Sequence, residues 1–368
     1  MRRSMLRLLA SLPLGVLVGA CGGSGGSDPV GPAPAPPAPP PAPNATLPSF
    51  LYVANRDSSD ISIFQLNVDG SLDPVGPAVA AGQEVSSVAI HPSGKFAYAL
   101  NSRSNSIGLY ELDADSGGLS FRREFGTGAR PEQMLIHPSG QFAFVSTTSI
   151  GNIGLYSIDG ATGDLEEKHR LHAGATVTRI AMHPSGTSVY YGSPGDGVVL
   201  RFEFDQANLR LILRESAPAV PNPFDIAITP TGNFAYVCNV FNFMTIYPVD
   251  AVTGALGSGR SAPVVGAFFV AVDPMGRFAY AAMPNLNKVE AFVIGDSGEL
   301  SSAGAVTTPS PASLTVDPSG KFVYVANGAA NTIAAYTINQ ASGALEPLGI
   351  PVAAGSGPSG LIVVSLAA

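Results

Sequence analysis

The sequence predicts an all-β fold, a seven-bladed β-propeller built from four-stranded antiparallel blades. Two observations predict it: an aromatic residue followed by a short apolar strand recurs seven times, and the same turn sequences return between these copies. The aromatic residues are Tyr52, Tyr98, Phe144, Tyr190, Tyr236, Tyr280 and Tyr324, separated by 46, 46, 46, 46, 44 and 44 residues. Such a regular period indicates one supersecondary unit repeated around an axis.

Residues 1–20 are expected to form a secretory signal peptide, because three arginines precede an apolar stretch that ends in small residues. The sequence V-G-A-C ending at Cys21 resembles the lipobox of bacterial lipoproteins, so lipidation of Cys21 is expected, with cleavage near Ala20 and no lipid as the alternative. Residues 21–48 are rich in Gly, Ser and Pro and are expected to be a linker. The propeller would then occupy residues 49–368.

These features predict a protein anchored by a lipid in the bacterial cell envelope, with the propeller in the periplasm or at the cell surface. Gly22 after the modified cysteine favours the outer membrane. Removing the signal peptide leaves 16 basic and 27 acidic residues, a net charge of −11. Such a surface repels polyanions, so nucleic acid is not expected as a partner. A monomer that touches the membrane only through its lipid is expected.

Residues 84–128 illustrate one repeat. The strand V-S-S-V-A-I is followed by the turn H-P-S-G, and then by the strands K-F-A-Y-A-L-N, S-I-G-L-Y-E-L and S-F-R-R-E-F. Four strands separated by Gly, Pro, Asn and Asp turns over about 45 residues are typical of one propeller blade. The turn before the fourth strand contains glycine in every copy except the one that begins at Gln206, Q-A-N-L-R-L.

The two ends of the domain predict how the ring closes. The domain begins at Phe50 with F-L-Y-V-A-N, a second strand without a first strand before it. It ends with G-P-S-G-L-I-V-V from Gly357, a first strand with nothing after it. We predict that these two strands pair, complete the seventh blade and leave no open sheet edge.

Repeats of the form P-S-G-K-F-x-Y-V-A-N, as at residues 318–327, are similar to the YVTN-type propeller repeat. With the D-x-x-T-G-x-L turns and the count of seven, residues 48–368 resemble the seven-bladed lactonase family, which includes one type of 6-phosphogluconolactonase and fungal carboxymuconate cyclases. The resemblance implies a lactone hydrolase that acts in the central channel. It implies no cofactor.

The resemblance does not extend to the motif residues of the family's active members, a histidine four residues before the H-P step and a glutamate after the second strand. The histidine position is occupied by Ser87, Gln133, Arg179, Asp225, Phe269, Ser313 and Gly360. The glutamate position is occupied by Arg56, Ser102, Ser193, Val240 and Gly328 where the register is clear. No catalytic residue is therefore predicted from the motif.

The first strands of a propeller line its channel, so the variable residues Gln133, Arg179 and Asp225 on three consecutive blades are expected near the axis. Neighbouring loops add Arg56, Asp57, Arg103, Arg130, Glu132 and Asn222. A mixed cluster of arginines and carboxylates in a concave mouth suits a small polar ligand or the polarisation of a carbonyl group. The alternative is that Arg179 and Asp225 only neutralise one another in a solvated channel.

Three histidines, His91, His137 and His183, recur in register on adjacent blades and suggest a metal site. Packed sheets lie roughly 10 Å apart, whereas zinc ligands must lie within about 2.1 Å of the metal, so one ion cannot reach all three. We expect these histidines to be hydrogen-bonding turn residues, and we predict no metal. Cys238 is expected to be a small buried hydrophobic residue.

The sequence predicts the first of three functions and leaves the other two as alternatives. The first is a ligand-binding or protein-binding module for an envelope protein or a small polar ligand. The second is a lactone hydrolase with Arg179, Asp225 and Glu132 as the polarising and acid–base groups, and the third is a surface structural protein without a specific ligand. It also leaves open whether five phenylalanines form core or an exposed apolar patch: Phe224, Phe241, Phe243, Phe268 and Phe269.

Overall fold

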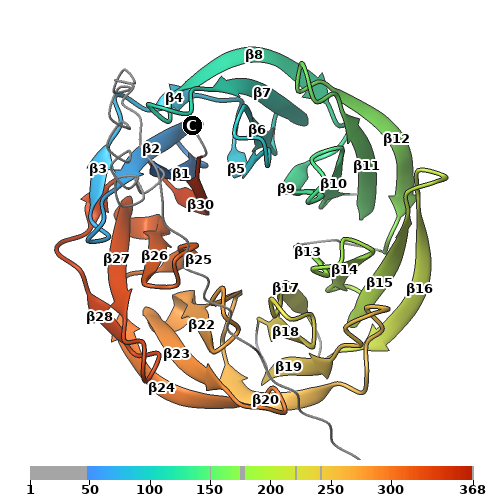
Figure 1. Ribbon diagram of the computed structural model, residues 1–368, viewed down its shortest axis with the longest axis vertical. Helices are drawn as coiled ribbons and strands as arrows, with labels where there is room; N and C mark the ends of the chain where they lie inside the picture. The colour runs from blue at the N-terminus through green and yellow to red at the C-terminus, as the bar shows by residue number, and fades with distance from the viewer. Residues whose placement is uncertain (1–47, 150, 175–178, 220–221, 241–242, 367–368) are drawn as a thin grey trace, which may run out of the picture. The chain divides into compact units, whose positions relative to one another are not determined.

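The computed structural model describes residues 48–149, 151–174, 179–219, 222–240 and 243–366. The predictions for the signal peptide, Cys21 and most of the linker lie outside these residues. Seven antiparallel sheets surround a central axis (Figure 1), which confirms the predicted seven-bladed propeller. Within the described residues no helix has the length and apolar character needed to cross a membrane.

The blades are numbered here in chain order of their second strands. Blade 1 comprises β30 (Pro358–Ser365), β1 (Ser49–Asn55), β2 (Asp60–Leu66), β3 (Leu72–Pro74) and β4 (Val79–Ala80). Blade 2 comprises β5 (Val85–Ile90), β6 (Phe96–Asn101), β7 (Ser106–Leu112) and β8 (Leu119–Gly126). Blade 3 comprises β9 (Pro131–Ile136), β10 (Phe142–Thr147), β11 (Asn152–Ile158) and β12 (Leu165–His172). Blade 4 comprises β13 (Ile180–Met182), β14 (Ser188–Ser193), β15 (Val198–Asp205) and β16 (Arg210–Pro218).

The remaining blades follow the same order from the axis outward. Blade 5 comprises β17 (Pro223–Ile228), β18 (Phe234–Asn239), β19 (Phe243–Pro248) and β20 (Arg260–Val265). Blade 6 comprises β21 (Phe269–Val272), β22 (Phe278–Met283), the 3-10 turn η1 (Pro284–Leu286), β23 (Lys288–Ile294) and β24 (Leu300–Thr307). Blade 7 comprises β25 (Pro311–Val316), β26 (Phe322–Asn327), the 3-10 turn η2 (Gly328–Ala330), β27 (Thr332–Ile338), β28 (Leu345–Pro347) and β29 (Val352–Ala353). In blades 1 and 7 the fourth strand is split into two pieces.

The two ends of the chain close the ring as predicted. β1 and β30 pair antiparallel, from Ser49 opposite Ser365 to Asn55 opposite Pro358. Blade 1 is therefore a sheet formed from both ends of the chain. β30 covers the edge of β1 that would otherwise be unpaired.

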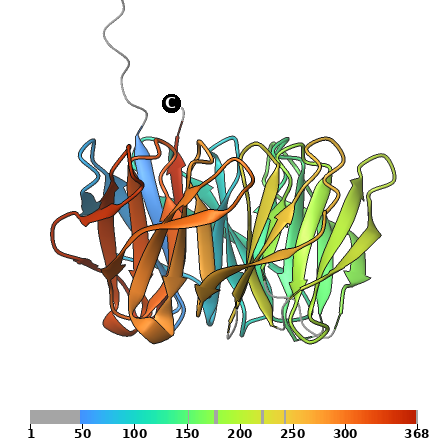
Figure 2. The same ribbon diagram turned by 90° about the horizontal axis from the view of Figure 1, so that it is seen from below.

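The turns between first and second strands lie on one face of the ring, called here the turn face, and the connections between second and third strands lie on the opposite loop face (Figure 2). Ser49 and Ser365 lie at the turn face, and Leu366 packs there beside the turn at Gly94. The first residues of β1 therefore lie at the face opposite the loops.

Repeated tyrosines join each blade to the next. In six of the seven interfaces the tyrosine hydroxyl donates a hydrogen bond to the carbonyl of the glycine in the following blade's last turn, at 2.6 to 3.1 Å. The pairs are Tyr52–Gly117, Tyr98–Gly163, Tyr190–Gly254, Tyr236–Gly298, Tyr280–Gly343 and Tyr324–Gly70. The regular spacing in the sequence thus reflects a regular contact between blades.

The interface between blades 3 and 4 lacks this hydrogen bond, and both of its partners are changed. Phe144 replaces the tyrosine, and Leu209 occupies the glycine position with a φ of 51°. A bulky residue with positive φ is strained. In compensation, the ring of Phe204 packs edge-on against Phe142 and Phe144, each at 5.1 Å, and Leu209 packs on the same cluster.

The recurring histidines also join neighbouring blades. His91 Nε2 lies 2.8 Å from the carbonyl oxygen of Gly140, and His183 Nε2 lies 3.3 Å from that of Gly232. A carbonyl only accepts, so Nε2 carries the proton, while Nδ1 of His91 accepts from the Ser93 amide at 3.1 Å. Burial lowers the pKa of His183. These contacts account for the histidines as neutral turn residues, and the described residues contain no cluster suited to a metal ion.

Replacing Tyr98 by phenylalanine is expected to lower the free energy of unfolding by about 1 to 2 kcal/mol. The change removes the hydroxyl and leaves the buried Gly163 carbonyl oxygen without its partner. Urea unfolding followed by circular dichroism measures the difference. A variant as stable as the parent would show that the hydrogen bond contributes nothing to blade packing.

Replacing Tyr191 by phenylalanine is expected to raise the free energy of unfolding, whereas Tyr98→Phe lowers it. Tyr191 is fully buried, and its hydroxyl has no hydrogen-bond partner within the described structure. Because an unpaired buried hydroxyl costs about 1 to 3 kcal/mol, Tyr191→Phe is expected to raise the free energy of unfolding by about 1 kcal/mol. Urea unfolding of both variants makes each the control of the other, and destabilisation by Tyr191→Phe would contradict the prediction.

Candidate functional site

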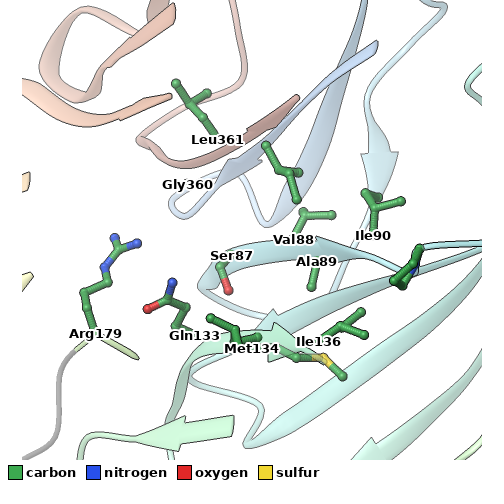
Figure 3. A pocket seen from close by; sticks show the side chains of 13 residues that line it. Ser87, Val88, Ala89, Ile90, Gln133, Met134, Ile136, Arg179, Gly360 and Leu361 are labelled. Carbon is green, nitrogen blue, oxygen red and sulfur yellow. The ribbon is translucent and has the colours of Figure 1, made fainter. Parts of the chain in front are cut away.

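The first strands enclose a cavity of about 300 Å³ at the axis of the ring. Ser87, Gln133 and Arg179 follow one another around it from blades 2, 3 and 4, with Gly360 and Leu361 of blade 1 beyond them (Figure 3). Ser87, Gln133 and Arg179 occupy the position four residues before the turn, and Gly360 occupies the equivalent position on β30. The structure therefore places four of the seven variable residues of the repeat around one cavity.

Asp225 occupies the same position on β17. Its Oδ1 accepts a hydrogen bond from its neighbour's amide, Ile226 N, and its Oδ2 accepts one from Val270 N on β21, both at 3.0 Å. Burial raises the pKa of Asp225, while the charge of Arg179 and the two amides lower it in part. Asp225 is nevertheless only partly buried and remains in contact with solvent. Asp225 is thus a carboxyl group fixed by two amides in an environment that disfavours its charge.

Gln133 makes the equivalent contact between blades 3 and 4, as Asp225 does between blades 5 and 6. Its side-chain oxygen accepts a hydrogen bond from Ile180 N on the next first strand, at 2.8 Å. Side chains at this level therefore join adjacent first strands, which holds Gln133 and Asp225 in fixed positions. The amide NH₂ of Gln133 is left to face the cavity (Figure 3).

Arg179 lies at the start of blade 4, between Gln133 on blade 3 and Asp225 on blade 5. Its guanidinium carbon lies 5.2 Å from the centre of the Phe269 ring, a cation–π contact. Among the described residues no ion pair joins Arg179 to Asp225. The two residues thus form no direct ion pair, although the charge of Arg179 lowers the pKa of Asp225. The alternative in which they neutralise one another in a solvated channel stays open.

An aromatic cluster accompanies Arg179 on blades 5 and 6. The rings of Phe224, Phe268 and Phe269 lie 5.6 to 6.4 Å apart, and each is partly exposed. Phe243 is 47% exposed at the start of β19. Phe241 lies outside the described residues. Of the four described phenylalanines, three are therefore partly buried and Phe243 is exposed, so they are neither closed core nor a fully exposed patch.

The charged residues predicted around the mouth form a separate cluster on the loop face of blades 1 to 3. Arg56 lies 3.2 Å from Glu132, and Arg130 and Arg103 lie 2.7 and 3.7 Å from Glu84. Arg56, Asp57, Glu84 and Arg103 also line an open hollow of about 430 Å³. The predicted arginines thus occur in ion pairs, and Glu84, which binds two of them, was missed because no motif marks it.

Asn222 and Cys238 make contacts within the scaffold. Asn222 has a φ of 65°, and its carbonyl accepts a hydrogen bond from Val240 N in a loop contact. Cys238 is fully buried on β18, as predicted.

Solved structures with the same fold include proteins of different chemistry. A protein of Bacteroides fragilis provisionally named 6-phosphogluconolactonase is 20% identical, with a TM-score of 0.78, over 88% of this chain and all of that one. The periplasmic gluconolactonase of Pseudomonas aeruginosa is 21% identical, with a TM-score of 0.75, over 87% of this chain and all of that one. Hydrazine synthase of Kuenenia stuttgartiensis is 19% identical, with a TM-score of 0.61, over 78% of this chain and 94% of that one. At these identities the likeness establishes the fold alone.

Sequence comparison gives the family. The search of curated proteins finds no sequence similar to this chain. The family model described as lactonase, seven-bladed β-propeller, matches residues 71–178 and 265–359, which together are more than half of the chain. The chain therefore belongs to the seven-bladed β-propeller lactonase family.

Proposed function

We propose that this chain is a lactone hydrolase that acts in its central channel, the second of the functions that the sequence leaves open. The observation that carries the proposal is that Asp225, a carboxyl group held by two backbone amides, and Arg179, which lies over Phe269, occupy equivalent positions on neighbouring blades without forming an ion pair. Membership of the lactonase family supports this function over a pure binding module.

Asp225 would act as the general base. Each of its oxygens accepts one backbone amide and keeps a lone pair for a water molecule. A raised pKa makes the carboxylate a better base than an exposed aspartate, which is the usual reason for burying such a group. The water gives its proton to Asp225 as its oxygen bonds to the lactone carbonyl carbon.

Arg179 would stabilise the negative charge that forms on the carbonyl oxygen. A guanidinium held against an aromatic ring in a partly enclosed site is preorganised for this task. When the tetrahedral intermediate collapses, the ring C–O bond breaks and Asp225 returns its proton to the leaving alkoxide. The product is a hydroxy acid. We assign no chemical step to Glu132, because it is paired with Arg56 at the rim.

The cellular setting is a proposal as well. We infer a lipid anchor at Cys21 in the bacterial envelope, with the outer membrane favoured and the propeller in the periplasm or at the surface.

Replacing Arg179 by alanine tests the proposal. The purified chain from Pro48 onward, which contains the complete ring, is expected to hydrolyse members of a panel of δ-lactones faster than their spontaneous rate. Arg179→Ala is expected to lower kcat by about 10²-fold, the usual effect of removing one oxyanion-stabilising group. Release of acid at constant pH measures both.

If no lactone in the panel is hydrolysed above the spontaneous rate, the hydrolase proposal fails. The binding-module function would then be the better hypothesis, and the search would turn to envelope partners and small polar ligands.

A further inference from the structure

Few charged side chains line the channel. The seven first strands, together with Arg179 just before β13, carry three charged side chains, Glu132, Arg179 and Asp225. Glu132 is paired with Arg56, so Arg179 is the single cation at the channel level that the described residues supply. Recognition of a phosphate dianion normally uses several cationic or amide donors. The channel is thus poorly suited to a phosphorylated sugar lactone.

Most of the cavity wall is apolar. Later along the same first strands, towards the turn face, the wall is aliphatic. It is lined there by Ala89, Ile90, Met134, Ile136 and Leu361 (Figure 3), and by Ile362. On the far side of Arg179 lies the aromatic cluster Phe224, Phe268 and Phe269. Ser87, Gln133 and Arg179 could pair with some hydroxyl groups of a polyhydroxylated sugar ring, but those directed at the aliphatic wall would stay unpaired, at a cost of roughly 1 to 3 kcal/mol each.

The location of these residues in the chain points the same way. Arg179 and Asp225 fall in residues 179–264, the stretch between the two segments that match the family model. Leu209, from the interface that lacks the tyrosine–glycine hydrogen bond, lies in the same stretch. The part of the ring that departs from the family pattern is therefore the part that supplies the reactive pair.

We propose that the lactone taken by this site is uncharged and carries an apolar substituent. The ring carbonyl faces Arg179 and Asp225, and the substituent lies against the aliphatic wall or the phenylalanine cluster. This inference rests on the proposed function for its reaction, but the walls that select the substituent are independent of whether the reaction occurs.

A series of δ-lactones that differ only in the substituent tests the inference. We expect kcat/KM to rise about two- to fourfold for each methylene from δ-valerolactone through δ-octalactone to δ-decalactone, which corresponds to burial of about one methylene at a time. Glucono-δ-lactone and 6-phosphogluconolactone are expected to be poorer substrates than δ-decalactone. A flat or falling series, or a preference for the phosphorylated lactone, would overturn the inference while leaving the hydrolase proposal intact.

The variant Phe269→Ala is expected to lower kcat/KM for δ-decalactone about tenfold and to lower it less for δ-valerolactone. Phe121→Ala is the matched control, because Phe121 lies on the outer strand β8 and is 59% exposed. Equal losses for both lactones in Phe269→Ala would show that the ring acts only through Arg179 and does not bind the substituent.

A binding measurement keeps the inference testable if no lactone is hydrolysed. Titration calorimetry with δ-valerolactam and its 6-pentyl derivative, which resist hydrolysis, is expected to show tighter binding of the pentyl compound by at least tenfold. Equal affinity, or no binding of either lactam, would refute an apolar site, whereas selective binding without hydrolysis would refute only the proposed reaction.

Discussion

Asp225→Asn is expected to lower kcat for lactone hydrolysis by about 10³-fold, because an amide cannot take a proton from the attacking water. General-base catalysis by a positioned side chain contributes typically 10²- to 10⁴-fold, so the expected loss is the middle of that range. The substitution keeps the size of the side chain, and one of the two amide contacts, from Ile226 or Val270, can still be accepted by the remaining oxygen.

The pH profile gives the same residue a signature that a folding defect would not produce. Burial raises the pKa of Asp225 above the ordinary value of 3.8. The base must be ionised, so kcat/KM is expected to fall as the pH falls through this raised pKa, with a midpoint above 3.8. Because the charge of Arg179 lowers the pKa of Asp225, Arg179→Ala is expected to move this acid limb to higher pH.

Asp250→Asn provides a matched control for the loss of activity. Asp250 lies in the same blade but at the turn between its last two strands, where its Oδ1 accepts hydrogen bonds from Val252 N and Thr253 N. Its replacement is expected to leave kcat within about twofold of the parent. If Asp225→Asn retained full activity with an unchanged acid limb, a different residue would have to be the base.

The sequence predicts the scaffold well because the scaffold is repeated. Tyr98 and its equivalents and His91 with its equivalents make the same contact in successive blades, so periodicity alone identifies them. The closure of the ring by β1 and β30 follows from the two incomplete ends of the repeat. The tyrosine and histidine contacts are local patterns that recur from copy to copy. Ring closure follows from the position at which the repeat is interrupted by the chain ends.

The candidate site is harder to predict because its residues are the exceptions to the repeat. The position shared by Gln133, Arg179 and Asp225 identifies which residues face the channel, but no spacing reveals that Arg179 lies over Phe269 and not against Asp225. The two ion pairs of Glu84 are equally invisible, because they join loops that are far apart in the sequence, one in the same blade at Arg103 and one in the next blade at Arg130. Contacts across the ring depend on side-chain directions that no local pattern encodes.

Ending the chain at Gly357 is expected to abolish cooperative folding of the propeller. The truncation removes β30, and with it the ladder that joins β30 to β1 from Ser49 to Asn55. It also removes Leu361 and Val363 from the cluster formed with Leu51 and Val53. Lost hydrogen bonds and apolar contacts together amount to about 5 to 10 kcal/mol, comparable with the whole stability of a typical domain.

Thermal unfolding followed by circular dichroism measures this loss, and light scattering reports association through the newly exposed edge of β1. A synthetic peptide of residues 358–366 is expected to restore the transition by adding the missing strand, whereas a peptide of the same composition in scrambled order is not. A truncated chain that unfolds at the parent temperature would show that the ring is held by contacts between blades without the terminal strand. Since Gly360 and Leu361 also border the cavity, restored folding with the peptide is expected to restore lactone hydrolysis as well.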